Sequence, residues 1–317
     1  MRQLYVVFLV GLLVGAGAAF AAGSDASLAD AVMRGDKEVL RLLPADRASI
    51  NAPQPDGTTA LHWAVRHDDI IAATALINAG ADVKATNRYG VTPMAVAAMN
   101  GNAAMLRLLL DSGADPNSAN PSGETALMTA ARTGNLGAVT LLLDRGGNVN
   151  AKDIVHEQTA LMWAVLENHF DVVKLLLMRG ADINAHTRVT MLKGEYVPAR
   201  PGGAAGMGII RQRALPTSDG GMTPLLFAVR DGNAQMTRWL LDRGAAINLS
   251  SGNHTTPLII ALLNGQVGLA TELLERGADP NAADDYHRAA LFAAIDLRNF
   301  NHENTATSLL TGATRWT

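Results

Sequence analysis

The string Leu-Leu-Leu-Asp-Ser-Gly-Ala-Asp-Pro-Asn at Leu108–Asn117 decides the fold of this chain, because reduced forms of it recur at a fixed spacing. The last residue of the string belongs to a column whose successive steps are 33, 33, 33, 34, 64 and 33 residues. The members of this column are Asn51, Lys84, Asn117, Asn150, Asn184, Asn248 and Asn281. A period of this length predicts a solenoid of stacked units instead of the two separate domains that 317 residues would otherwise suggest.

Two further columns keep the same register and mark the helices of each unit. A threonine followed by Ala or Pro and then by Leu or Met is expected to cap a first helix, and Pro is tolerated in the first turn. A glycine, or Asp68 or Asn168 in its place, is expected to end that helix in the left-handed conformation. A second helix follows, as in Leu136–Asp144. The capping residues are Thr59, Thr92, Thr125, Thr159, Thr223 and Thr256, and the glycines are Gly35, Gly101, Gly134, Gly232 and Gly265.

These motifs resemble those of ankyrin-repeat proteins, and the resemblance covers the chain from about Ser24 to the C-terminus apart from one insert. It implies an all-α solenoid of stacked helix-turn-helix units with finger loops, with about seven full repeats and a partial last one. It also implies that first helices and finger tips form a concave surface that binds partner proteins without catalysis. We expect a degenerate capping repeat at 22–55, repeats at 56–187, an insert loop at 188–221, and repeats at 222–317 with an incomplete last unit.

The N-terminal segment 1–21 is predicted to be a signal peptide. Arg2 supplies a positive charge, Leu4–Val14 is almost continuously apolar, and Ala19-Phe20-Ala21 is a small-x-small cleavage motif. The expected product is a periplasmic or secreted protein cleaved near Ala21. The alternative is an uncleaved segment that anchors the protein in a membrane, because the apolar stretch is just long enough to span one.

Composition and motifs argue against catalysis. Charged residues make up 17% of the chain, its formal net charge is −3, and it has no cysteine, which excludes a disulfide framework, a thiolate metal site and a cysteine nucleophile. A near-neutral balance gives no reason to expect nucleic-acid binding. The chain has no HExxH, G-x-S-x-G or phosphate-loop motif. We therefore predict no catalytic residue, cofactor or metal. His62 lies in the Thr-Ala-Leu-His start that resembles the family's motif, and the resemblance implies that it hydrogen-bonds loop backbone.

The predicted partner-binding residues come from three places. By resemblance, the two residues before each helix-ending position lie on the concave face, and finger-tip residues lie beside them. The third place is the insert at 188–221, whose five basic and two acidic residues give it a net charge of +3. Trp63 and Trp163 are expected to pack in the core instead. The predicted binding set is Arg66, His67, Arg88, Tyr89, Met99, Asn100, Arg132, Thr133, Leu166, Glu167, Arg200, Arg211, Arg213, Arg230, Asp231 and Leu263.

These observations leave more than one function open. The first is a non-catalytic scaffold, expected to be a monomer, that binds a partner protein on its concave groove. Arg66, Arg132 and Arg230, together with a basic clamp formed by the insert, would favour an acidic segment of that partner. The alternative is the targeting or regulatory half of a larger enzyme whose catalytic part lies beyond residue 317. An enzyme built on the insert is a third interpretation, and an insert that binds nothing is the alternative to the clamp.

Overall fold

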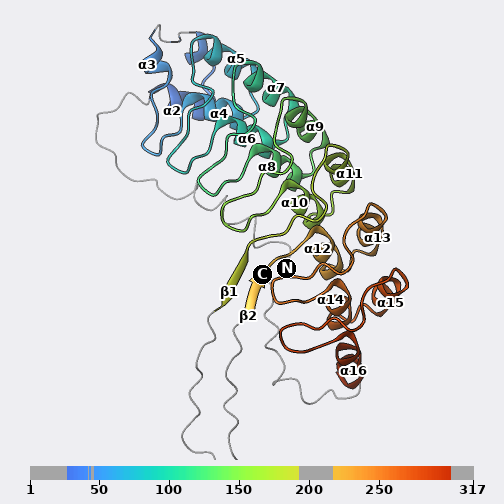
Figure 1. The fold of residues 1–317 in the computed structure, drawn as a ribbon. Coiled ribbons are helices and arrows are strands. Elements are labelled where there is room, and N and C mark those ends of the chain that lie inside the picture. Colours follow the sequence, from blue (N-terminus) through green and yellow to red (C-terminus); the bar gives the residue numbers. More distant parts are fainter. Residues whose placement is uncertain (1–26, 42, 44–45, 193–216, 301–317) are drawn as a thin grey trace, which may run out of the picture.

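The computed structural model describes residues 27–41, 43, 46–192 and 217–300. The predicted signal peptide and its cleavage site lie outside the described residues, as do Arg200, Arg211 and Arg213 of the insert. Within the described part, helix pairs stack side by side into one curved array, and the long loops project from the inner side of the curve (Figure 1). The chain is therefore built as the solenoid that its period predicts.

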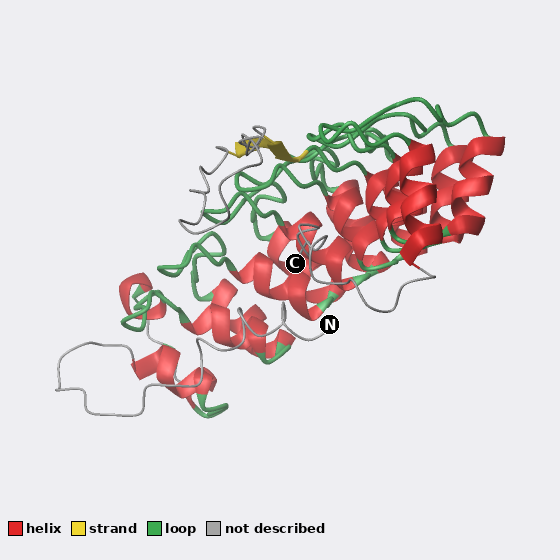
Figure 2. Ribbon diagram, turned by 90° about the horizontal axis from the view of Figure 1, so that it is seen from below, coloured by secondary structure: helices red, strands yellow, loops and turns green. Residues whose placement is uncertain are grey.

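Each complete unit contributes one inner helix beside the loops and one outer helix on the convex side (Figures 1 and 2). The inner helices are α4 (Ala60–Arg66), α6 (Pro93–Asn100), α8 (Ala126–Thr133), α10 (Ala160–Leu166), α12 (Pro224–Arg230) and α14 (Pro257–Leu263). The outer helices are α5 (Ile70–Asn78), α7 (Ala103–Asp111), α9 (Leu136–Asp144), α11 (Phe170–Met178), α13 (Ala234–Asp242) and α15 (Val267–Glu275). The bounds predicted for α9 are confirmed.

Local capping explains where these helices begin and end. Thr92 Oγ1 accepts a hydrogen bond of 3.1 Å from the Ala95 N–H at the start of α6, which satisfies a donor that the helix leaves open. Gly101 ends α6 with a φ of 70°, in the left-handed region where glycine has no steric penalty. Asp68 and Asn168 take the same role with φ of 55° and 58°, so the left-handed conformation predicted for them is confirmed.

The terminal units depart from this pattern. The first contains α2 (Ser27–Met33), a single 3-10 turn η1 (Val39–Arg41) in place of a second helix, and α3 (Arg47–Ile50). The last described element is α16 (Ala290–Phe300), an inner helix. Both ends therefore present a shortened unit within the residues that the structure describes.

The ends of the insert are strands, which corrects the prediction of a loop at 188–221. Strand β1 (Val189–Leu192) pairs antiparallel with β2 (Thr217–Gly220), and the register places Val189 opposite Gly220 and Leu192 opposite Thr217. Thr187 N–H donates 3.0 Å to the Met222 carbonyl just below this ribbon, which brings the two ends of the insert together. The pairing depends on contacts between segments far apart in sequence, so the local composition of the insert did not reveal it.

A single apolar core runs through the stack. Inner helices contribute Leu61, Leu127 and Leu161, and outer helices contribute Leu109 and Leu142, all almost completely buried. Because each face is covered by the next unit, the core depends on stacking and not on any one helix pair. No helix in the described residues is long and apolar enough to cross a membrane.

Candidate functional site

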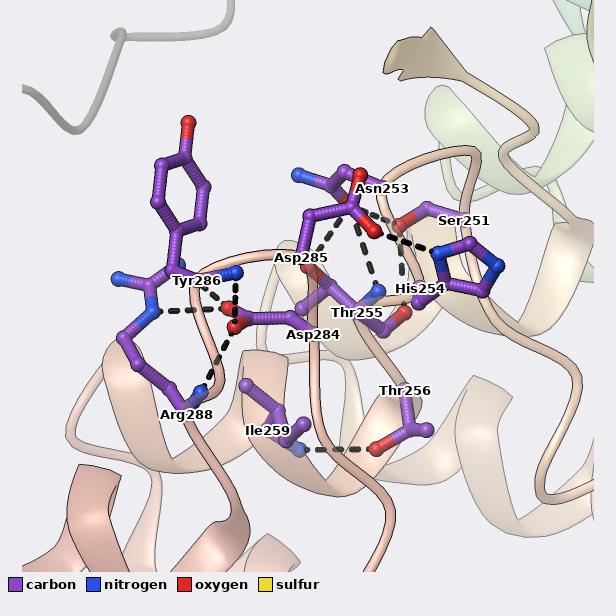
Figure 3. A network of polar contacts seen from close by, with 10 residues as sticks. All are labelled: Ser251, Asn253, His254, Thr255, Thr256, Ile259, Asp284, Asp285, Tyr286 and Arg288. Atoms are coloured by element: carbon purple, nitrogen blue, oxygen red, sulfur yellow. Dashed lines mark hydrogen bonds and ion pairs between the residues drawn. The ribbon is translucent and has the colours of Figure 1, made fainter. Parts of the chain in front are cut away.

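The finger loops are folded by a repeated Asp or Asn side chain. Asp284 Oδ1 accepts hydrogen bonds of 2.9 Å from the backbone N–H groups of Tyr286 and Arg288, and Asn253 Oδ1 accepts 2.7 Å from Thr255 Oγ1 (Figure 3). Such side chains satisfy loop donors and fix the turn. The same role recurs at Asp56, Asn87, Asn120 and Asp153. This column was visible in the repeat register, but it was not singled out as what holds the fingers.

Neighbouring fingers are also joined to one another. The Asp285 N–H donates 3.1 Å to the Asn253 carbonyl, and His254 Nδ1 lies 2.6 Å from Asp285 Oδ1 (Figure 3). The Ile154 N–H makes the corresponding backbone bond of 2.7 Å to Ser122. Backbone hydrogen bonds therefore join most neighbouring fingers along the inner side of the array, which pre-organises this surface.

The finger tips expose apolar side chains. Ile154 is 61% exposed and Val155 is 52% exposed, and both lie in a hydrogen-bonded turn. Tyr89 and Tyr286 are exposed on other fingers. Tyr89 was predicted to take part in binding. Ile154 and Val155 were not predicted, because two adjacent apolar residues in a loop do not indicate from sequence alone whether they are exposed.

A small hollow of about 170 Å³ lies between two adjacent fingers and α10. Its lining residues are Ser122, Glu124, Asp153, Val155, His156, Gln158 and Trp163. Trp163 packs against the core with part of its ring and borders the hollow with the rest, so the expectation that it is simply a core residue is half right. Trp63, its counterpart in the first complete unit, is likewise half-buried and donates 2.8 Å from Nε1 to Gln54 Oε1.

The arginines of the inner helices are held by their own neighbours. Arg132 Nη2 lies 3.0 Å from Glu124 Oε1, and its guanidinium lies 5.3 Å from the centre of the Trp163 ring. Arg230 pairs with Asp231 at 3.0 Å. Intramolecular carboxylates therefore offset part of the positive potential that was expected along this column.

The other predicted binding residues lie at the ends of the inner helices and at the fingers. Asn100 has a structural role as well, because its side chain donates 3.0 Å to the Val65 carbonyl of the preceding unit. Arg88 and Tyr89 form a local pair, with the guanidinium 4.8 Å from the ring centre. Leu166 is half-buried, and exposed side chains are found at Arg66, His67, Met99, Thr133, Glu167, Asp231 and Leu263.

His62 is a structural residue, as expected. Its Nδ1 accepts a bond of 3.2 Å from the Thr59 N–H, and its Nε2 lies 3.0 Å from the Val91 carbonyl of the next finger. A ring that accepts at Nδ1 carries its proton at Nε2 and donates it to Val91. Burial lowers the pKa of His62 below its ordinary value, although the bond to the Val91 carbonyl acts in the opposite direction. The neutral ring therefore links two units.

The described residues were also compared with the requirements of a metal site and of acid–base catalysis. No group of three or more His, Asp or Glu side chains there is arranged to hold a metal ion. The acidic residues bordering the hollow are committed to the fold, since Asp153 accepts backbone bonds from Val155 and His156.

Comparisons with known proteins agree with this architecture. A family model for ankyrin repeats, which spans three copies, matches residues 28–120, 97–187 and 207–284, more than half of the chain. A solved structure described as the ankyrin repeat domain of Bcl-3, a unique member of the IkappaB protein family, is 26% identical with a TM-score of 0.61. The match covers 77% of this chain and 99% of that one. A comparison with curated protein sequences finds no match. With this repeat register, this stack of helix pairs and these matches, the chain belongs to the ankyrin-repeat family.

Proposed function

We propose that this protein is a non-catalytic scaffold that binds a partner protein on its inner, concave side. The observation that carries the proposal is the hollow between two fingers, bordered by Trp163 and Val155, beside the exposed Ile154. Aromatic and apolar groups on a rigid surface are suited to anchor a partner side chain. Ankyrin repeats generally mediate protein–protein interaction, which supports the same conclusion.

We also propose that the partner presents an acidic segment, which would meet arginines other than Arg132 and Arg230. Arg132 and Arg230 are paired internally, so the exposed Arg66 and Arg88 are better placed to meet a carboxylate. Rim charges of this kind act mainly on the rate of association and are screened by salt. The protein is proposed to act as a monomer, and sedimentation at several concentrations would test this.

The experiment combines crosslinking with matched variants. Partners would be captured by crosslinking mass spectrometry, and the affinity of the strongest candidate would be measured for the parent chain and for Val155→Glu. A charge at the hollow should weaken binding by about tenfold or more. Ile71→Glu is the matched control, because Ile71 is 77% exposed on the outer helix α5 and should leave the affinity unchanged. Crosslinks confined to the outer helices would contradict the proposal.

The contribution of the insert is tested by a deletion that the ribbon geometry suggests. Removing residues 190–219 joins Val189 to Gly220, which face each other across the ribbon. The Gly221 N–H already donates 3.3 Å to the Arg188 carbonyl, which is the bond of a four-residue turn, and Gly220 has the positive φ of 86° that the third position of a type II turn requires. The array should stay folded. Under the clamp hypothesis it should bind its partner more weakly, and full affinity would mean that the insert binds nothing.

We also propose that the protein acts after export to the periplasm or beyond the cell. The charged start, the apolar run Leu4–Val14 and the motif ending at Ala21 support cleavage. Cell fractionation and the N-terminal sequence of the mature protein would test this. A mature chain that retains Met1–Ala21 would favour the membrane-anchored alternative.

A further inference from the structure

The outer helices of neighbouring units are tied together by a repeated ion pair at their C-terminal ends. The last residue of one outer helix is an aspartate, and the residue that follows the next outer helix is an arginine. The pairs are Asp111–Arg145 at 2.6 Å, Asp144–Arg179 at 2.8 Å and Asp242–Arg276 at 2.6 Å. This ladder of ion pairs runs along the convex side of the array, away from the fingers.

The ladder is interrupted between α11 and α13. Met178 stands where α7, α9 and α13 carry an aspartate, and its side chain is 77% exposed. Arg243 is the corresponding arginine, directly after the last residue of α13. Its guanidinium lies 4.9 Å from the centre of the Trp239 ring, and no carboxylate of the described residues lies within ion-pair distance of it. One cation of the ladder is therefore left without its anion.

A hollow of about 410 Å³ opens at the same junction. Phe170 from α11 and Trp239 from α13 line it and meet edge to face, with ring centres 5.4 Å apart, and both rings remain half-buried. In Figure 1, α11 and α13 are the outer helices on either side of the insert. The lining residues are Phe170, Lys174, Gln235, Arg238, Trp239 and Asp242.

The other charges around the hollow are already matched. Lys174 Nζ lies 3.3 Å from Asp171 Oδ1, and Arg238 Nε lies 2.7 Å from Glu272 Oε2. Asp242 is held by the ladder pair described above. Among the described residues, the unbalanced charge at the junction is therefore that of Arg243, which lies over the Trp239 ring.

We propose that this junction, formed by Met178, Arg243 and the hollow between α11 and α13, docks a segment of a partner protein that carries a carboxylate beside an apolar side chain. The carboxylate pairs with Arg243 and takes the place that an aspartate fills in the three ion pairs of the ladder. The apolar side chain enters the aromatic hollow, where burial of its surface adds to affinity. Because this site lies on the convex side, it is separate from the concave surface proposed above and goes beyond that function.

The substitution Met178→Asp gives a sharp test, because it supplies the missing carboxylate from within the chain. Short random peptides displayed on phage would be selected on the full chain in the presence of excess soluble Met178→Asp variant. The recovered peptides should carry Asp or Glu next to Leu, Met, Phe or Trp. Thermal unfolding would confirm that the variant is folded, which is expected because Met178 is exposed.

The affinity of one recovered peptide, made synthetically, would then be measured with matched variants. Arg243→Glu should weaken binding by about tenfold or more, and so should replacing the acidic residues of the peptide with their amides. Arg107→Glu is the control, since Arg107 occupies the same position in α7 as Lys174 does in α11 and lies two units away. Its binding should stay within about twofold of the parent.

Three results would overturn the proposal. The first is a selection that yields no peptide preferring the parent chain to Met178→Asp. The second is a recovered peptide that binds Arg243→Glu as tightly as the parent. The third is binding that is insensitive to the convex variants and lost in Val155→Glu, since such a peptide occupies the concave side and supports only the function proposed there.

Discussion

Two neighbouring junctions of the array differ in how their outer helices are joined. Between α9 and α11 the Asp144–Arg179 ion pair closes the ladder at 2.8 Å. Between α11 and α13, Met178 replaces the aspartate, Arg243 has no ion-pair partner among the described residues, and an aromatic pair lines a hollow instead. The comparison shows that two junctions with the same repeat register can differ in their side-chain contacts. A single residue, Asp144 at one junction and Met178 at the next, determines whether the ion pair between outer helices forms. The open junction also lies where the insert interrupts the repeats, since β1 and β2 stand between α11 and α12 in the chain.

The largest expected effect concerns the core, which both junctions share. Leu142→Ala should lower the free energy of unfolding by about 2–5 kcal/mol, because Leu142 is fully buried between neighbouring units. Met178→Ala, at the exposed end of the next outer helix, should stay within about 0.5 kcal/mol of the parent. Reversible denaturant unfolding of the three chains measures both values. A loss below about 1 kcal/mol for Leu142→Ala would mean that α9 is not packed as described.

The aromatic pair should account for much of the remaining contact at the looser junction. A double-mutant cycle with Phe170→Leu and Trp239→Leu is expected to give a coupling energy of about 0.5–1.5 kcal/mol, since the rings meet edge to face. Denaturant unfolding of the two single variants and the double variant yields this number. If the two effects simply add, the pair does not hold α11 and α13 together.

The ladder itself should contribute less. Asp144→Asn is expected to cost about 0.2–1 kcal/mol, and Met178→Asp to stabilise the chain by no more than that, because these ion pairs are partly exposed. Both effects should shrink as salt is raised. Thermal unfolding at low and high salt compares them. An equal shift at both salt concentrations would point to helix propensity instead of charge.

The titration of His62 should not change the free energy of unfolding at neutral pH. It should lower this free energy only when the solution is acidified. The folded-state pKa of His62 is lowered by burial, so below about pH 6.5 the unfolded chain takes up a proton that the folded chain does not. The free energy of unfolding should therefore fall as the pH drops through this range. His62→Met, with the residue found at the same repeat position in Met128 and Met162, should reduce this slope.

The control for this measurement is His67→Gln, because His67 is exposed at the end of the same helix. Denaturant unfolding across the pH range should give this variant the slope of the parent. A slope that persists in His62→Met would assign the acid sensitivity to other groups.

The sequence by itself determined the elements of this protein. The threonine caps, the left-handed Asp68 and Asn168, and the bounds of α9 depend on interactions within a few residues, which the local pattern contains. The backbone role of His62 was implied by the resemblance of its helix start to the family's motif. Periodicity was sufficient to predict the stack, since one helix pair cannot bury its apolar face alone.

Only the tertiary structure determined which side chains meet on the surfaces of the array. Glu124 meets Arg132 and Trp163, and β1 pairs with β2, because segments far apart in the chain are brought together. The column that contains Asp144 and Met178 could be read from the register. Whether an aspartate of one unit reaches an arginine of the next is set by the distance and angle between stacked helices, and no residue in the column specifies that geometry.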